Sequence, residues 1–248
     1  PTLRAKVAVI AHRGDHTQAP ENTLRALENA VRAGADYVEV DLRTTRDGQI
    51  VVLHDRTVDR TTDGSGAVAE MTLAEVRALA VRDPRAPAGA PPERIPTFEE
   101  MLRAAGRRMR WYLDCKEIDP AQVAASLRRH GRERAAVVYD DPEGCAAWKK
   151  AAPWMPVMTS PPREATTPEA LDAFLTEWPV EILDGPYFFY TAALADVARR
   201  RGVALWPDIQ NPGEGPDQWR VPLELGATGL QSDHPGALRA WLEREKRR

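Results

Sequence analysis

Short segments rich in β-branched residues alternate with longer helical patterns along most of this chain, and that alternation most constrains its fold. The candidate strands are Val7–Ala11, Tyr37–Leu42, Ile50–Leu53, Trp111–Cys115, Ala136–Tyr139, Pro156–Met158, Glu181–Leu183, Val203–Leu205 and Gly229–Gln231. Most of them are separated by helical stretches at Thr23–Arg32, Thr97–Ala105, Pro120–Arg129, Gly144–Ala151, Pro168–Glu177, Thr191–Arg200, Gln218–Leu225 and Pro235–Glu245. This alternation predicts an α/β fold with a parallel sheet.

Eight strand–helix units fit a (β/α)8 TIM barrel, and a chain of 248 residues suits a single barrel domain over residues 1–248. A doubly wound open sheet is the alternative, but no glycine-rich dinucleotide-binding fingerprint follows the first strand. Residues 54–96 interrupt the rhythm with a DGSG turn, a short helix at Leu73–Leu79 and a proline-rich run. Because this segment is too long for an ordinary strand-to-helix loop, it predicts a small insertion after the second strand.

Two helix starts carry a capping signature. Thr72 and Thr97 each precede a glutamate by three residues, so their hydroxyls can cap a helix while Glu75 and Glu100 reach back.

Composition excludes several classes of partner. The formal net charge of −3 gives no basic footprint for nucleic acid. No apolar run approaches the ~18 residues of a membrane-spanning helix. The two cysteines, Cys115 and Cys145, form no metal-type cluster, and a disulfide between them is left open. The oligomeric state is open, and so is the choice between a cytoplasmic and an exported protein.

Two carboxylates share one face of the strand Tyr37–Leu42. Glu39 and Asp41 are two residues apart, so both point away from the side of Val38 and Val40. Barrel strands are buried on both faces, where neighbouring carboxylates repel each other and lose hydration. A proton or a bound cation would relieve the repulsion, and oxygen ligands favour Mg²⁺ or Ca²⁺. A half-exposed strand with its polar residues in solvent is the alternative.

The strand Trp111–Cys115 repeats this arrangement. Asp114 and Lys116 are two residues apart and share a face. Asp114 would then complete the carboxylate set while Lys116 holds an anion beside it. The alternative is a buried ion pair between the two side chains.

Histidines follow two of the candidate strands. His12 and Arg13 come directly after the first strand, and His54 follows Ile50–Leu53. A lone histidine at such a place is more often structural. Two imidazoles together with carboxylates, an arginine and a lysine describe a phosphate receptor with proton-transfer groups beside it. This set predicts phosphodiester hydrolysis without a nucleotide loop. We interpret His16, in the loop after His12, as structural, with a ligand contact as the alternative.

Against this background the sequence resembles the glycerophosphodiester phosphodiesterase family. The matching pieces are HRG at 12–14, PENT at 20–23, GADYVEVDLRTTRDGQIVVLHD at 34–55 and RTTDGSG at 60–66. Weaker likeness continues through YLDCK at 112–116 and GATGLQSDHPGAL at 226–238. The resemblance implies a TIM barrel with a small insertion after the second strand. It also implies hydrolysis of a small-molecule glycerophosphodiester to sn-glycerol 3-phosphate and an alcohol.

The resemblance also implies roles for individual residues. His12 and His54 would be the general acid/base pair. Glu39, Asp41 and Asp114 would bind one divalent cation, Mg²⁺ or Ca²⁺.

Further roles concern the phosphate and the loop after the first strand. Arg13 and Lys116 would hold the phosphate. Glu21 and Asn22 would fix the loop, with Glu21 near the substrate, and Gly14 would let the backbone turn close to the ligand.

The chain departs from the family pattern in three places. The third acid is Asp114, where many relatives have glutamate. The segment LWPDIQN at 205–211 replaces a family motif, although Trp206 keeps the aromatic residue expected to wall the glycerol part. Phe188 and Phe189 either line the leaving-group side or pack against the rim.

Two other functions remain as alternatives. A sphingomyelinase D-like phosphodiesterase would act on lysophospholipids and need an apolar mouth, for which the aromatic residues around Phe188 are the only sign. A non-catalytic barrel that binds phosphoesters is the other, although both histidines are present.

Overall fold

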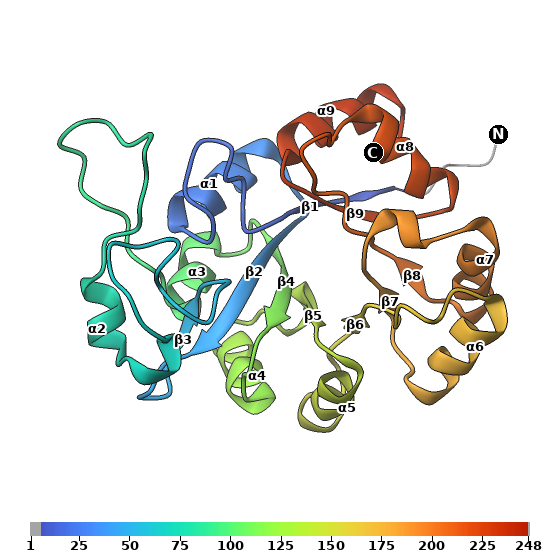
Figure 1. Cartoon of the computed structure of the whole chain (residues 1–248), viewed down its shortest axis with the longest axis horizontal. Coiled ribbons are helices and arrows are strands. Elements are labelled where there is room, and N and C mark those ends of the chain that lie inside the picture. The colour runs from blue at the N-terminus through green and yellow to red at the C-terminus, as the bar shows by residue number, and fades with distance from the viewer. Residues whose placement is uncertain (1–5, 248) are drawn as a thin grey trace.

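The computed structural model describes residues 6–247, in which eight parallel strands form a nearly closed barrel (Figure 1). The barrel strands are β1 (Ala8–Ala11), β2 (Tyr37–Thr44), β4 (Arg110–Cys115), β5 (Ala136–Tyr139), β6 (Val157–Thr159), β7 (Ile182–Leu183), β8 (Ala204–Leu205) and β9 (Gly229–Ser232). They pair in the order β8-β7-β6-β5-β4-β2-β1-β9. An isolated parallel bridge between Asp208 and Gln231 brings the two ends of the sheet together. The predicted TIM-like barrel is confirmed.

Helices lie outside the ring of strands (Figure 1). They are α1 (Leu24–Ala33), α2 (Leu73–Ala78), α3 (Phe98–Ala105), α4 (Pro120–Arg129), α5 (Pro142–Ala151), α6 (Pro168–Glu177), α7 (Ala192–Arg201), α8 (Pro216–Glu224) and α9 (Pro235–Arg244). Single 3-10 turns occur at η1 (Val68–Glu70), η2 (Glu133–Ala135) and η3 (Tyr187–Phe189). Both predicted capping boxes are confirmed, because Thr72 and Thr97 exchange hydrogen bonds with Glu75 and Glu100. Within residues 6–247 no helix has the length and apolar character to cross a membrane.

One candidate strand is not part of the barrel. The strand β3 (Ile50–Val52) pairs antiparallel with the end of β2, through a turn in which Thr45 accepts the backbone amide of Gln49 through its hydroxyl. The chain therefore leaves the barrel after Thr44, earlier than the predicted insertion start at residue 54. The excursion has its own small apolar cluster, made of Val51, Leu53, Val58, Val68, Val76, Val81 and Ile95.

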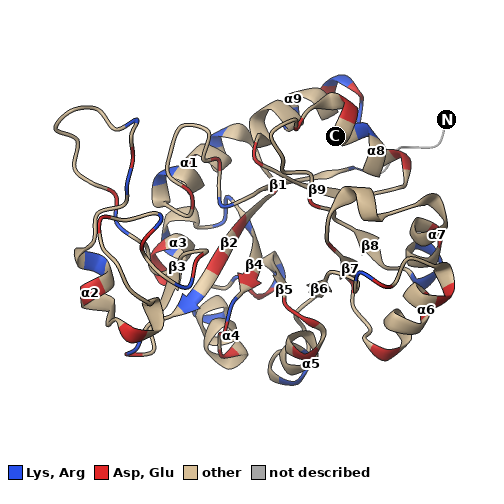
Figure 2. Cartoon of the chain, viewed as in Figure 1, with Lys and Arg blue, Asp and Glu red and all other residues tan. Residues whose placement is uncertain are grey.

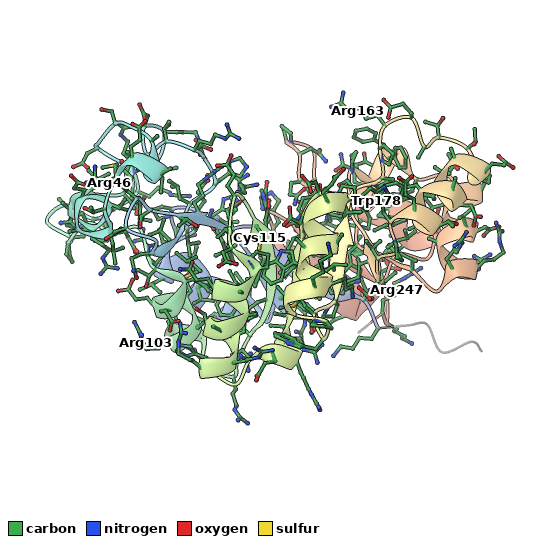
Figure 3. All side chains as sticks on the ribbon, turned by 90° about the horizontal axis from the view of Figure 1, so that it is seen from below. Arg46, Arg103, Cys115, Arg163, Trp178 and Arg247 are labelled. Atoms are coloured by element: carbon green, nitrogen blue, oxygen red, sulfur yellow. The ribbon has the colours of Figure 1, made fainter. Side chains whose placement is uncertain are left out.

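The strands are apolar on both faces, as a barrel requires. The outward side chains, such as Val9 and Val40, pack with the helices in the main core. Inward side chains away from the carboxyl ends of β1, β2 and β4 fill the barrel and form a second cluster, made of Ile10, Tyr112, Val137, Met158, Ile182 and Trp206. Cys115 lies in the interior of the molecule (Figure 3), and both cysteines are free, so no disulfide links them.

Candidate active site

The inward positions become polar toward the carboxyl ends of β1, β2 and β4. His12 follows β1 directly, while Glu39 and Asp41 continue the inward face of β2 that begins at Tyr37. In the sheet register Asp41 lies opposite Asp114 of β4. Figure 2 shows the acidic segments of β2 and β4 side by side. The alternation of a strand thus places carboxylates from two neighbouring strands at the same end of the barrel.

Three carboxylates meet there. Glu39, Asp41 and Asp114 each offer an oxygen, and these atoms lie within 4.8 Å of one another. Glu39 and Asp41 are only 2% and 1% exposed. Burial, followed by the charges of Asp41 and Asp114, raises the pKa of Glu39 well above its usual value. Burial also raises the pKa of Asp114. A buried set of three carboxylates that offers only oxygen ligands fits a hard divalent cation.

Two basic side chains flank these carboxylates. Lys116 Nζ lies 2.6 Å from Asp114 Oδ2 and 3.4 Å from Asp41 Oδ1. Arg13 Nε lies 3.4 Å from Asp41 Oδ2 on the other side. Asn22 Nδ2 also donates to Asp41 Oδ2, at 2.7 Å. Asp114 therefore has the geometry of both alternatives, an ion-pair partner of Lys116 and a member of the carboxylate cluster.

The loop after β1 is held in an unusual backbone conformation. Arg13 and Asn22 have φ angles of 51° and 58°, in the left-handed region that side chains other than glycine rarely adopt. The Arg13 amide donates to Glu39 Oε2 at 2.7 Å, which ties the loop to β2. Gly14 has φ 80°, and a Cβ there would lie 2.8 Å from Ala26 atoms. The close approach that needs glycine is thus to helix α1, a contact that the sequence did not indicate.

Each proposed catalytic histidine is oriented by a carboxylate. His12 Nδ1 lies 2.6 Å from Asp233 Oδ1, and His54 Nδ1 lies 2.7 Å from Asp55 Oδ1. A carboxylate accepts hydrogen bonds, so Nδ1 carries the proton in both rings and Nε2 is the nitrogen available for proton transfer. Hydrogen bonds from His12 and His16 outweigh burial and lower the pKa of Asp233. A hydrogen bond from Arg60 lowers the pKa of Asp55.

Arg60 was not singled out from the sequence, yet it joins two parts of the site. Its guanidinium donates to both Glu21 oxygens at 2.8 Å and to Asp55 Oδ2 at 2.7 Å. Arg13 Nη1 donates to Glu21 Oε1 at 3.0 Å. Burial would raise the pKa of Glu21, but the hydrogen bonds from Arg60 and the charge of Arg13 hold it at about 2. Glu21 therefore lies beside the site as a partner of two arginines.

A second acidic group lies on the opposite wall of the barrel. Asp184 follows β7 and is 3% exposed, and its Oδ2 accepts the hydroxyl of Tyr112. Asp208 follows β8 and accepts a hydrogen bond from Gln231. Burial raises the pKa of Asp184 well above its usual value, and the charge of Asp208 adds to the shift. These two acids were not singled out from the sequence. Their one sign in the sequence is that Asp184 and Asp208 each come two residues after a side chain that points into the barrel, Ile182 and Trp206.

The aromatic residues predicted near the substrate are placed differently. Trp206 packs inside the barrel, with its ring centroid 4.9 Å from that of Tyr37 and its Nε1 3.2 Å from Thr228 Oγ1. Tyr37 begins β2, so these contacts put Trp206 toward the end of the barrel away from His12, and its expected role as a wall for the glycerol part stays a prediction. Phe188 is 76% exposed, so it does not pack against the rim.

Comparison with known proteins agrees with this geometry. The Glycerophosphoryl diester phosphodiesterase family matches residues 12–237. A glycerophosphodiester phosphodiesterase of Caldanaerobacter subterraneus is 47% identical over 103 residues, which are 41% of this chain and 41% of that protein. The alignment thus spans less than half of that relative's length. Over nearly the whole chain, 31% identity links it to "Probable glycerophosphodiester phosphodiesterase 1" of Mycobacterium tuberculosis, covering 95% of this chain and 92% of the relative.

A solved structure extends the likeness to the fold. The crystal structure of a glycerophosphodiester phosphodiesterase from Agrobacterium tumefaciens superposes with a TM-score of 0.80 at 27% identity, covering 94% of this chain and 99% of that one. The family match over most of the chain and the near full-length relative lead to one conclusion: this chain belongs to the glycerophosphoryl diester phosphodiesterase family.

Proposed function

We propose that this protein hydrolyses glycerophosphodiesters to sn-glycerol 3-phosphate and an alcohol with the help of a divalent cation, Mg²⁺ or Ca²⁺. The observation that carries the proposal is the pairing of two carboxylate-oriented imidazoles, His12 and His54, with a buried carboxylate cluster and its two basic neighbours. Family membership supports the same substrate class.

In this proposal Arg13 and Lys116 bind the phosphate. Their positive charges now lie against Asp41 and Asp114, at 2.6–3.4 Å. A phosphodiester oxygen beside them would share those charges, and charge-assisted hydrogen bonds to phosphate are among the strongest in proteins. The cation would be held by Glu39, Asp41 and Asp114, and it would supply electrostatic stabilisation of negative charge on the phosphate oxygens.

The histidines move protons in two stages. A substrate hydroxyl next to the ester attacks phosphorus, one imidazole Nε2 takes its proton, and the other protonates the departing alcohol oxygen. The resulting cyclic phosphate is then opened by water with the two roles exchanged. Asp233 and Asp55 keep each ring in the tautomer that leaves Nε2 reactive and stabilise its protonated form.

A lysophospholipid-cleaving phosphodiesterase of the sphingomyelinase D type is the second candidate, favoured by one observation. Phe188, in the 3-10 turn after β7, is exposed and lies against Tyr187 at a ring-centroid distance of 5.6 Å. An apolar rim of this kind would suit an acyl chain. Release of choline with a cyclic phosphate from lysophosphatidylcholine would favour this candidate over the first.

One screen tests the proposal. Choline, ethanolamine, glycerol and inositol esters of sn-glycerol 3-phosphate are incubated with the protein and Mg²⁺, Ca²⁺ or Mn²⁺, and sn-glycerol 3-phosphate is measured enzymatically. We expect metal-dependent product from at least one ester and none after chelation. Absence of product from every ester and metal would overturn the proposed function.

A further inference from the structure

Three side chains beside the carboxylate cluster form a second potential metal-binding group. Asp233 Oδ1 lies 2.6 Å from His12 Nδ1 and 3.0 Å from His16 Nε2. The three ligand atoms lie within 4.8 Å of one another. His16 and Asp233 are 217 residues apart in the sequence, and the pairing of β1 with β9 brings them together. His16 thus has a contact that its loop position alone did not reveal.

The donor atoms of this group differ from those of Glu39, Asp41 and Asp114. Two imidazole nitrogens and one carboxylate oxygen are the ligands that zinc prefers, whereas the all-oxygen set suits Mg²⁺ or Ca²⁺. Three protein ligands with a free fourth position are typical of open zinc sites. The histidine-containing group should therefore prefer zinc, and the carboxylate group should prefer Mg²⁺ or Ca²⁺.

The ligand atoms must move apart by less than about 1 Å to hold zinc. Zinc binds nitrogen and oxygen at about 2.0–2.2 Å, so neighbouring ligands of a tetrahedral ion lie about 3.3–3.5 Å apart. The observed separations from Asp233 are 2.6 Å for His12 and 3.0 Å for His16, which are shorter than this by about 0.7–0.9 Å and about 0.3–0.5 Å. His12 and His16 meet edge to face, with ring centroids 6.1 Å apart and an interplanar angle of 73°. Their ring planes therefore do not stack and can converge on one ion.

Hydrogen bonds fix the backbone around these three ligands, and the ligands can be reached from solvent. The amide of Asp233 donates to Glu214 Oε2 at 3.0 Å, and the amide of His12 donates to Ser232 O at 3.1 Å. Arg85 Nη1 donates to the His16 carbonyl at 3.3 Å. A cavity of about 370 Å³ opens onto His16 and Asp233 from the loop at 210–212. An ion can reach the ligands without opening the barrel.

We propose that His12, His16 and Asp233 bind a zinc ion, which inhibits the enzyme by taking His12 Nδ1 away from Asp233. Metal binding uses the lone pair of Nδ1, so the proton of the neutral ring moves to Nε2. The ring then has no free lone pair with which to accept a substrate proton. The inhibition rests on the proposed catalytic function of His12, whereas the binding of zinc does not.

The binding arm uses Co²⁺ as a spectroscopic substitute for zinc. Protein saturated with Mg²⁺ is titrated with Co²⁺, and visible absorption bands of a four-coordinate site are expected, which Zn²⁺ then displaces. His16→Ala should remove these bands or weaken Co²⁺ binding at least tenfold. His130→Ala is the matched control, because His130 pairs with Glu99 on helix α3, outside this group. Equal Co²⁺ spectra for the parent and His16→Ala would overturn the site, whether or not the protein is a phosphodiesterase.

The activity arm measures inhibition by Zn²⁺ at saturating Mg²⁺, with each variant compared with its own uninhibited rate. We expect His16→Ala to raise the half-inhibitory Zn²⁺ concentration at least tenfold and His130→Ala to leave it unchanged. Inhibition that is equal in all three proteins would assign the effect to the carboxylate cluster and contradict this proposal. A protein that binds Co²⁺ through His16 but hydrolyses no ester would keep the zinc site and discard only the inhibition and the proposed function.

Discussion

Single contacts decide the chemistry of the proposed site. His12 and His54 resemble each other in having a carboxylate on Nδ1, but Asp55 also binds Arg60 while Asp233 is shared with His16. The sequence predicted both histidines because each follows an apolar strand. Neither Asp233 nor His16 was predicted as a partner, because a contact across 217 residues leaves no local pattern.

Replacing either proposed catalytic histidine tests the proton-transfer roles. His12→Ala and His54→Ala should each lower kcat by about 10²–10⁴-fold, the usual contribution of a positioned acid or base. Both side chains are partly exposed at the barrel rim, so the melting temperature should change little. Steady-state kinetics and thermal unfolding give the two readouts. Near-normal turnover of the His54→Ala protein would remove that residue from the mechanism.

Asp114 separates the ligand and ion-pair interpretations. As a ligand, Asp114→Asn should raise the metal concentration for half-maximal activity about tenfold or more, with excess metal restoring part of the rate. As a partner of Lys116 only, the same change would remove the shorter of the two carboxylate contacts of that ammonium, leaving Asp41 at 3.4 Å, and would lower stability by about 1–3 kcal/mol with metal dependence unchanged. Asp114→Glu, which restores the commoner family residue, serves as the conservative control. A metal titration of Asp114→Asn that overlays the parent's would exclude the ligand role.

At the scale of elements, sequence periodicity predicted nearly all of the strands and helices to within one or two residues. The exception in topology is β3, because a short apolar run reads the same in an antiparallel hairpin as in a parallel barrel. The contacts of Trp206 inside the barrel were not predicted, for a related reason. Its inward direction follows from strand alternation, but its height in the barrel depends on a strand register that the sequence does not reveal.

Arg60 links the excursion after β2 to the loop after β1, and this link can be tested by mutation. Arg60 lies in the excursion, and its guanidinium donates hydrogen bonds to Glu21 of the loop and to Asp55 beside His54. Arg60→Ala should lower kcat about tenfold or more by freeing the partner of His54, since small misplacements of catalytic groups are costly. Stability should fall by less than about 1 kcal/mol, because these ion pairs are partly exposed.

The matched control for Arg60 is Arg56→Ala. Arg56 is in the same excursion and pairs with Glu117 at 2.7 Å, but its side chain is 77% exposed. Kinetics of both variants with one substrate give the comparison. If the Arg60→Ala and Arg56→Ala proteins have the same kcat, the hydrogen bonds of Arg60 have no role in positioning His54.

At the scale of the whole molecule, the barrel interior carries acids whose pKa values are raised by burial. Burial raises the pKa of Asp184, Asp208, Asp114 and Glu39, which lie on opposite walls of the barrel. A group whose pKa is higher in the folded state binds protons that the unfolded chain releases. Its contribution to stability is therefore largest at acidic pH and is lost as the pH rises through the folded value. Groups with lowered pKa, such as Glu21 at about 2, stabilise the folded protein fully above about pH 4.5, and this contribution is lost as the pH falls from there toward 2.

Asp184→Asn tests this balance away from the proposed metal ligands. The amide oxygen can still accept the Tyr112 hydroxyl, and the amide nitrogen can donate to Asp208, so the pair no longer needs a proton. The parent should become less stable as the pH rises from 5 to 8, and the variant should show a flatter profile with a gain of about 1–3 kcal/mol at the alkaline end. Chemical denaturation at several pH values measures this. Asp172→Asn is the control. Asp172 is exposed and pairs with Arg201, which lowers the pKa of the Asp172 carboxyl, so replacing Asp172 should leave the slope between pH 5 and 8 unchanged. A variant with the parent's slope would show that Asp184 ionises freely in the folded protein, and the pH dependence would then belong to the other buried acids.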